Sequence, residues 1–232
     1  MQIVKLDSRL SSVASLVRNG SRVADVGTDH AYLPVYLLQT GVSPSAVAAD
    51  LRKMPLENAR KTVEMYSLED KITTVLSDGL DSIDKDTCDD IVIAGMGGLL
   101  ITELISRTVW LRNSRYRLVL QPMSHAEDVR RFLFENGFEI VEECCSRDGR
   151  HYYCVIAAEY SGERTFYSPA AVYVGKLDAG SDEITRTYLE KQLQRLEKRC
   201  NALKKASADN DAEVEKLSEI IIDFKRLTEK MT

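Results

Sequence analysis

The chain has 232 residues, of which 44% are hydrophobic and 29% charged, and its formal net charge is −5. That length is enough for one sizeable core, or for a domain of roughly 150 residues with an appendage. The acidic balance gives no support to nucleic-acid binding by the chain as a whole, so such a partner needs a local basic patch. No apolar run reaches the ~20 residues that span a bilayer, and MQIVKLDSRL lacks the apolar core of a signal peptide. We therefore expect a cytoplasmic protein that contacts no membrane.

Apolar runs of strand length alternate with helical patterns as far as about Tyr160. The expected strands span 22–27, 46–51, 71–77, 90–95 and 117–122, and the helices between them span 32–41, 54–68, 98–111 and 125–137. The strands are almost continuously apolar, which is typical of strands that helices cover on both faces. This alternation predicts right-handed βαβ units in a parallel, doubly wound α/β sheet.

Two further β-rich runs occupy residues 138–160 and meet at Asp148-Gly149, a dipeptide typical of a tight hairpin turn. Five parallel strands closed by an antiparallel hairpin are the layout of a Rossmann-like class I methyltransferase sheet. A nicotinamide dehydrogenase more often ends its sheet with another parallel strand.

The tail from about Ser181 has a different, helical pattern. Its apolar residues recur at spacings of three and four, in one stripe of Leu189, Leu193, Leu196, Cys200 and Leu203 and a second stripe of Val214, Leu217, Ile221, Phe224 and Leu227. Two antiparallel helices joined at residues 208–211 bury both stripes, which predicts a C-terminal coiled-coil hairpin. We expect a methyltransferase domain at 1–165 and a helical coiled-coil domain at 166–232.

Charge is distributed unevenly over this tail. The first helix carries the basic residues Arg186, Lys191, Arg195, Lys198, Arg199, Lys204 and Lys205, and the second begins with the acidic residues Asp209, Asp211, Glu213, Glu215 and Glu219. One interpretation is two solvated faces that pair with each other. The other is a basic surface for a phosphate backbone. A second concentration of positive charge comprises Arg112, Arg115, Arg117, Arg130 and Arg131.

The first strand ends in VADVGTDHAYLP, residues 23–34. A dinucleotide site needs further glycines so that the backbone can approach a pyrophosphate, but Gly27 is followed by Thr28, Asp29 and His30. S-adenosylmethionine carries no phosphate and needs fewer glycines. An acidic side chain beside Gly27 suits the cationic end of that cofactor.

Acidic residues also end the next two strands. Asp50 is placed to accept hydrogen bonds from two ribose hydroxyls, and the turn at Asp78-Gly79 is placed to receive an adenine amino group. Each signal alone is weak, because Asp50 or Asp29 can equally cap a helix. Together they lie at the edge where open α/β sheets bind ligands, and they predict a site for S-adenosylmethionine.

The fourth strand runs into AGMGGLL, whose Gly95, Gly97 and Gly98 allow backbone conformations and close approaches that other residues forbid. The alternative is a tight turn whose glycines serve packing alone. Amino-group methyltransferases of nucleic acid commonly place an Asp/Asn-Pro-Pro-aromatic motif here, and this chain has none. A ring nitrogen such as N1 of adenine already offers a lone pair, so positioning and a nearby acidic group would supply most of the catalysis.

Five stretches of the sequence carry a family resemblance: LDSRL (6–10), GTDHAYLP (27–34), AGMGG (94–98), LQP (120–122) and NGFEIV (136–141). They resemble the bacterial tRNA (adenine(22)-N1)-methyltransferase family, TrmK, over nearly the whole chain. The resemblance implies a Rossmann-like methyltransferase domain, S-adenosylmethionine as methyl donor, and an adenine in the D-arm of tRNA as acceptor. The chain departs from the family at Met123, where Asn is usual, and at Thr28, where Ser is common.

The motifs and the resemblance together predict the site. Asp29, His30 and Tyr32 are expected to be catalytic, with Asp29 in an electrostatic or proton-accepting role and Tyr32 stacking on the base; local packing and a helix cap are the alternative. The expected cofactor-binding residues are Asp25, Gly27, Asp29, His30, Asp50, Leu51, Asp78, Gly79, Gly95, Met96 and Gly97. The expected substrate-binding residues are Arg9, Gly98, Gln121, Pro122, Arg195, Lys198 and Arg199.

Metal is not expected. The five cysteines, Cys88, Cys144, Cys145, Cys154 and Cys200, form no CxxC pair, so we expect buried or free thiols. Two other functions fit the same residues: methylation of a small molecule or protein, and a non-catalytic nucleotide-binding scaffold that dimerises through its coiled coil. The oligomeric state is left open, and a monomer is compatible with the sequence.

Overall fold

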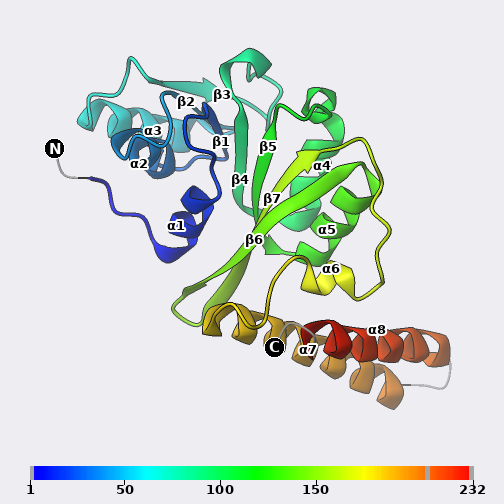
Figure 1. The fold of residues 1–232 in the computed structure, drawn as a ribbon. Helices are drawn as coiled ribbons and strands as arrows, with labels where there is room; N and C mark the ends of the chain where they lie inside the picture. Colours follow the sequence, from blue (N-terminus) through cyan, green and yellow to red (C-terminus); the bar gives the residue numbers. More distant parts are fainter. Residues whose placement is uncertain (1–2, 207–209, 230–232) are drawn as a thin grey trace.

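Figure 1 shows the computed structural model, which describes residues 3–206 and 210–229. Its centre is a seven-stranded sheet in the order β3-β2-β1-β4-β5-β7-β6. The parallel strands are β1 (Val23–Val26), β2 (Ala46–Asp50), β3 (Ile72–Leu76), β4 (Asp90–Gly97) and β5 (Arg117–Ser124). The antiparallel hairpin of β6 (Phe138–Asp148) and β7 (His151–Tyr160) closes the sheet beside β5. The predicted fold class is confirmed.

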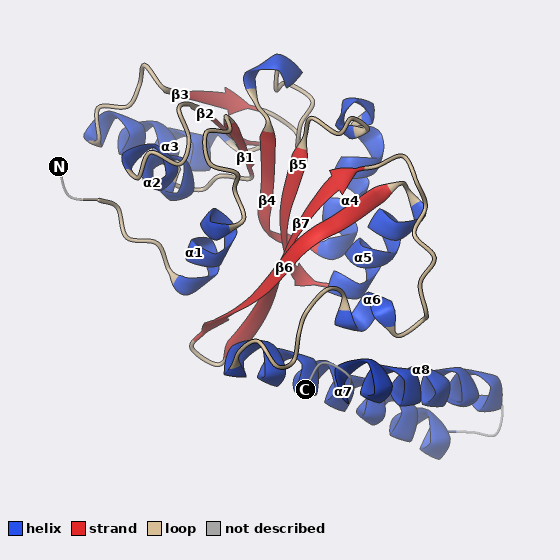
Figure 2. Ribbon diagram, in the orientation of Figure 1, coloured by secondary structure: helices blue, strands red, loops and turns tan. Residues whose placement is uncertain are grey.

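Helices cover both faces of the sheet (Figure 2), as the continuous apolar character of the strands requires. On one face lie α1 (Ser8–Ser15), α2 (Tyr32–Gln39) and α3 (Lys53–Met65), and on the other lie α4 (Gly98–Arg107) and α5 (Ala126–Glu135). Successive strand residues alternate between the two cores: Val23 packs on the first side and Ala24 on the second.

Four helical segments differ from the sequence prediction. The helix expected at 98–111 ends at Arg107, and a separate 3₁₀ turn follows at Val109–Leu111. Thr108 lies between them, and its hydroxyl donates a hydrogen bond to the Leu104 carbonyl. The helices α1 and α6 (Ala171–Val174) were not predicted, and neither was the 3₁₀ turn at Lys85–Thr87. All are too short to show helical periodicity in a sequence.

The tail forms the predicted pair of helices, α7 (Glu183–Ala206) and α8 (Asp211–Glu229), which lie side by side along the lower edge of the molecule in Figure 1. The predicted joint at 208–211 and the acidic Asp209 fall partly or wholly outside the described residues. The buried hydrophobic side chains of α7 and α8 are Tyr188, Leu189, Leu196, Cys200, Leu217, Ile220 and Phe224, and they belong to the same apolar core as α5 and α6. The two stripes therefore pack on α5 and α6 as well as on each other.

A buried ion pair links α5 and β6 to α6, the helix that precedes the tail. Arg130 of α5 is 1% exposed, and its Nε lies 2.8 Å from Oε1 of Glu143 on β6. Nη1 of Arg130 donates to the Val172 carbonyl of α6, while the Lys176 N–H donates to Glu143. Burial acts to lower the pKa of Arg130, but the Glu143 carboxylate outweighs it and raises that pKa well above its usual value. The suggestion that Arg130 belongs to a basic surface patch is therefore wrong.

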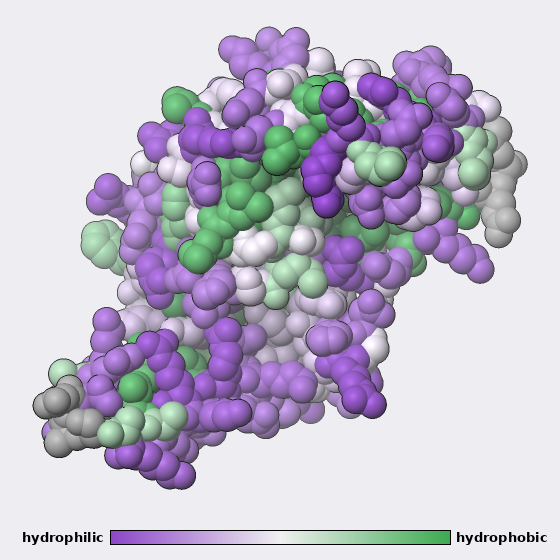
Figure 3. Space-filling model, turned by 180° about the vertical axis from the view of Figure 1, so that it is seen from behind, coloured by the Kyte–Doolittle hydropathy of each residue, from purple (hydrophilic) through white to green (hydrophobic). Residues whose placement is uncertain are grey.

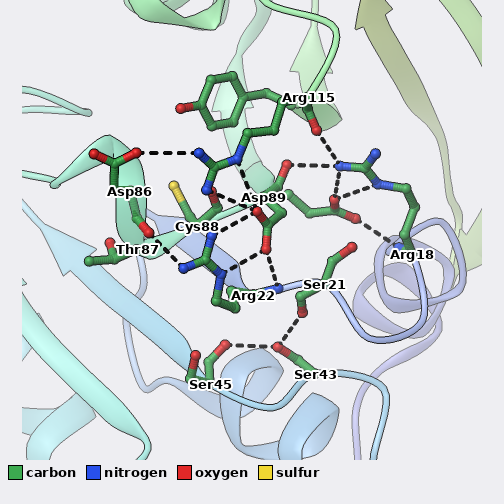
Figure 4. A network of polar contacts seen from close by, with 12 residues as sticks. Arg18, Ser21, Arg22, Ser43, Ser45, Asp86, Thr87, Cys88, Asp89 and Arg115 are labelled. Atoms are coloured by element: carbon green, nitrogen blue, oxygen red, sulfur yellow. Dashed lines mark hydrogen bonds and ion pairs between the residues drawn. The ribbon is translucent and has the colours of Figure 1, made fainter.

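The amino ends of β1 and β4 are joined by a second polar network, shown in Figure 4. Arg22 and Arg115 both donate hydrogen bonds to Asp89, and Arg18 pairs with the fully buried Asp90 at 2.6 Å. The hydrogen bonds from Arg22, with those from Arg115, hold the pKa of Asp89 well below its usual range. These ion pairs therefore hold β1 and β4 together at their amino ends, on the opposite side of the sheet from the carboxyl ends of the strands.

Candidate active site

The loop after β1 depends on the conformation of Gly27. This residue has φ +81°, and a Cβ there would lie 2.2 Å from the Met96 Cε. The Gly27 and Thr28 N–H groups donate to the Ala49 carbonyl of β2 at 2.8 and 2.9 Å. The Thr28 hydroxyl accepts a hydrogen bond from the Ala31 N–H at 3.1 Å, just before α2 begins. A glycine therefore lets this loop pass closely over the carboxyl edge of the sheet.

The three predicted catalytic side chains project together from this loop. The rings of His30 and Tyr32 stack with centroids 5.2 Å apart, and the Nε2 of His30 lies 3.4 Å from Oδ2 of Asp29. The Asp29 side chain is 64% exposed, and the cap position of α2 is Ala31, with no side-chain cap hydrogen bond. The alternative role of Asp29 as a helix cap is therefore excluded, whereas local stacking of His30 and Tyr32 is present at the surface.

Asp25 is one of two buried acidic groups among the predicted site residues, with Asp50. It lies on β1 and is 7% exposed. Burial raises its pKa from 3.8 to about 6, against the opposing effects of a hydrogen bond with Thr28 and the positive charge of Arg9, while nearby Asp50 raises it further. The site thus contains a carboxylate that a neighbouring cation would stabilise.

Gln121 connects α1 to the end of β4. Its side chain is fully buried; Oε1 accepts hydrogen bonds from Arg9 Nη1 at 2.8 Å and from the Gly95 N–H at 3.0 Å, and Nε2 donates to the carbonyl of the buried Pro122. The β4–β5 register shifts at Gly95, which has φ +77°. Gln121 therefore holds Arg9 over the strand ends, a positioning role that the sequence did not suggest.

Close packing explains Gly98. This residue is buried at the start of α4, and a Cβ on it would lie 2.4 Å from the His125 carbonyl oxygen and 2.6 Å from that of Ser124. No side chain fits there without moving backbone. For Gly98 the packing interpretation is therefore supported, whereas Gly97 and Met96 remain partly exposed at the turn.

Asp50 at the end of β2 and Asp78 after β3 both have hydrogen-bonding partners within the chain. Asp50 is 6% exposed, and its Oδ1 accepts a hydrogen bond from the Arg52 N–H at 2.7 Å; the described residues supply no such bond to Oδ2. Asp78 is bound more fully, because its Oδ1 lies 2.6 Å from Nη2 of Arg107. Asp50 therefore retains hydrogen-bonding capacity at the site, while a ligand at Asp78 would have to share it with Arg107.

Exposed apolar side chains surround this edge. They include Leu51 after β2, Leu76 at the end of β3, Leu99 and Leu100 in the first turn of α4, and Met123 in β5. Seen from behind, the larger part of the molecule, which holds the sheet, shows a group of hydrophobic residues, and the tail is mostly hydrophilic (Figure 3). Apolar surface of this kind suits flat aromatic rings such as adenine.

The predicted basic residues of α7 are partly neutralised. Arg195 lies 2.7 Å from Glu127 of α5, and Arg199 lies 2.6 Å from Glu213 of α8. Lys198 is exposed and forms no ion pair within the described part of the chain. In the second basic concentration, Arg115 pairs with Asp86 and Asp89, Arg117 with Glu159 and Arg131 with Asp128. The interpretation as paired, solvated charges thus holds for much of both groups.

The described residues form neither a metal site nor a disulfide. Among residues 3–206 and 210–229, no cluster of three or more His, Cys, Asp or Glu side chains is placed to hold a metal ion. All five cysteines are free thiols. No described helix has both the length and the apolar character needed to cross a bilayer.

Sheet order and site geometry define a Rossmann-like methyltransferase, and a family model described as a methyltransferase domain matches residues 6–156. The tRNA (adenine(22)-N(1))-methyltransferase of Bacillus subtilis is 31% identical over 224 residues, which cover 95% of this chain and 94% of that protein. The chain belongs to this tRNA (adenine(22)-N(1))-methyltransferase family.

Two solved structures extend the similarity to the whole fold. The B. subtilis m1A22 tRNA methyltransferase TrmK superposes with a TM-score of 0.84 at 29% identity, covering 95% of this chain and 99% of the other. TrmK of M. capricolum, in complex with the cofactor product S-adenosylhomocysteine, gives a TM-score of 0.79 at 25% identity and covers 98% and 99% of the two chains. Both comparisons include the helical tail.

Proposed function

We propose that this protein transfers a methyl group from S-adenosylmethionine to N1 of adenine 22 in the D-arm of tRNA. The observation that carries the proposal is the similarity to the B. subtilis enzyme, which extends over 95% of this chain and so includes the tail as well as the methyltransferase domain. A general methyltransferase core would account for residues 6–156 alone. A tRNA substrate is consistent with the cytoplasmic location that we expected.

The carboxyl edge fits S-adenosylmethionine. The Gly27 turn leaves no Cβ beside Met96, Asp50 retains a carboxylate oxygen for ribose hydroxyls, and exposed Leu51 and Leu76 offer apolar surface for adenine. Asp25 supplies negative charge for the ammonium and sulfonium end. Arg9, held by Gln121, supplies positive charge for the carboxylate. When bound, the cofactor presents an electrophilic methyl group.

The residues of the GTDHAYLP loop then act on the acceptor base. N1 of adenine attacks with its own lone pair, so no proton has to leave before transfer, and the methylated base acquires positive charge. The Asp29 carboxylate is exposed on the loop that faces this position, and stabilises the developing charge. Tyr32, whose ring stacks on that of His30, provides a flat surface against which the base is oriented.

The experiment uses the full chain, methyl-labelled S-adenosylmethionine and two tRNA transcripts that differ only in carrying A or G at position 22. We expect label in the A22 transcript, recovered as 1-methyladenosine after digestion to nucleosides, and background label in the G22 transcript. Absence of label from the A22 transcript, or equal label in both, overturns the assignment. Label in a protein or small-molecule fraction instead would favour the alternative acceptor.

A further inference from the structure

The β6–β7 hairpin extends past the ladder that joins it to the rest of the sheet. β7 pairs with β5 only through Ile156–Glu159, with Leu120 opposite Ile156. Because the two strands are antiparallel, residues 151–155 of β7 continue in the direction of the β5 carboxyl end. Their partners on β6 run to Asp148, so the tip of the hairpin stands beyond the catalytic edge.

A small hollow lies where β5 and β7 diverge. It has a volume of about 90 Å³ and is lined by Met123 and His125 after the β5 ladder, by Tyr152 and Tyr153 of β7, and by Arg195 of α7. Met123 follows the Gln121-Pro122 pair of the active site directly. The hairpin tip, α7 and the catalytic edge therefore meet at one place.

Two cations converge on a single aromatic ring at this place. The Arg147 guanidinium carbon lies 5.6 Å from the centroid of Tyr152, and Nζ of Lys191 lies 5.2 Å from it. Both distances are within the ~6 Å range of cation–π attraction. The ring thus holds a charge from the hairpin and a charge from α7 near each other, although like charges repel.

The cations at the Tyr152 ring have no carboxylate partner within the described part of the chain. Among the described residues no ion pair involves Arg147, Lys191 or the neighbouring Arg150, whereas Arg195 is paired with Glu127. The one acidic side chain of the turn, Asp148, is exposed at the tip. Lys191 and Lys198 are seven residues apart on α7, so the unpaired charge continues along one face of that helix.

We propose that Arg147 and Lys191, organised around Tyr152, and Arg150 in the same hairpin turn bind tRNA phosphates next to the target adenine. This inference rests on the proposed function and adds the surface that holds its substrate. Unpaired cations beside a catalytic edge suit a polyanion, because binding exchanges condensed counterions for fixed charges. Tyr152 is a positioning residue, since its ring keeps both cations in place before the tRNA arrives.

The first test removes the charges in the full-length enzyme. Arg147→Ala/Arg150→Ala and Lys191→Ala should each raise the KM for tRNA at least fivefold near 0.15 M salt and leave kcat within about twofold. The slope of log K against log salt should flatten by roughly 0.7 to 0.9 for each lost phosphate contact. Lys61→Ala/Lys71→Ala is the matched control, because both lysines are exposed and Lys71 precedes β3 at the opposite edge of the sheet.

The second test separates positioning from packing. Tyr152→Phe keeps the ring and should bind tRNA like the wild type, whereas Tyr152→Leu should raise the tRNA KM and flatten the salt slope although no charge is removed. Calorimetric titration with S-adenosylmethionine and a thermal melt show that each variant is folded. If Tyr152→Leu lowers tRNA affinity without changing the salt slope, the ring does not organise the cations and the proposal is overturned.

The outcomes also distinguish this inference from the proposed function. Wild-type enzyme that methylates the A22 transcript, combined with charge variants that match the Lys61/Lys71 control in KM and salt slope, overturns the phosphate surface alone. Wild-type enzyme that binds S-adenosylmethionine and methylates no tRNA overturns the proposed function, and the inference with it. A selective rise in KM and a flatter slope for the hairpin and Lys191 variants support the proposal.

Discussion

Replacing Asp25 with Asn tests whether the buried carboxylate contributes to cofactor binding at a cost to folding stability. The pKa of Asp25 is raised from 3.8 to about 6, mainly by burial. A shift of about two pKa units corresponds to roughly 3 kcal/mol, at 1.36 kcal/mol per unit. Because the folded pKa is the higher one, the folded state is favoured by protonation below pH 3.8, and this contribution is lost as the pH rises to about 6.

Asp25→Asn has nearly the same shape and carries no charge. The variant should therefore gain up to about 3 kcal/mol in unfolding free energy at pH 7 relative to wild type, and this gain should shrink towards pH 4. Its affinity for S-adenosylmethionine should fall at least tenfold at pH 7, because the cationic end loses its countercharge. Denaturant unfolding at several pH values and calorimetric titration measure the two effects. A variant that is less stable at pH 7, or that binds the cofactor normally, refutes the reasoning.

Three further predictions concern the neighbouring residues and the tail. Asp50→Ala loses charge-assisted hydrogen bonds worth ~1.5 to 3 kcal/mol each, so cofactor affinity should fall at least tenfold in calorimetry; unchanged affinity removes Asp50 from the site. Asp29→Asn should lower kcat about tenfold or more and keep cofactor affinity, whereas an unchanged kcat would exclude its electrostatic role. Deleting the tail after Gly180 removes Tyr188 and Leu196 and uncovers the core of α5 and α6 that they pack on, so the melting temperature should fall along with tRNA affinity; a melting temperature equal to that of the full chain contradicts a shared core.

The sheet could be predicted from the sequence because its strands are buried on both faces. Burial makes 46–49 and 91–94 apolar without interruption, and Asp148-Gly149 marks the hairpin. The strand-end positions of Asp25, Asp50 and Asp78 follow from that topology alone. The short helices α1 and α6 do not, because one or two turns of helix give no periodic signal.

The partners of the charged residues could not be predicted. Arg195 meets Glu127, 68 positions away in the chain, and Asp78 meets Arg107, 29 positions away. Only the folded arrangement shows which cations remain unpaired. A count of basic residues in the sequence therefore favoured Arg195 and Arg199 for tRNA contact, while the structure draws attention to Lys191 and to the hairpin tip.

Buried contacts fix the position of the tail relative to the sheet. The Arg130–Glu143 pair is buried and binds the backbone of α6, and Tyr188 of α7 donates a hydrogen bond to the sulfur of Cys154 on β7. Removing one partner of a buried ion pair typically costs ~3 to 5 kcal/mol, so α6 and the helices that follow it are held firmly. A phosphate contact on α7 therefore lies at a fixed place relative to Asp29 and Asp25. Binding energy from such a contact can then orient the base in the active site, because little flexibility separates the two.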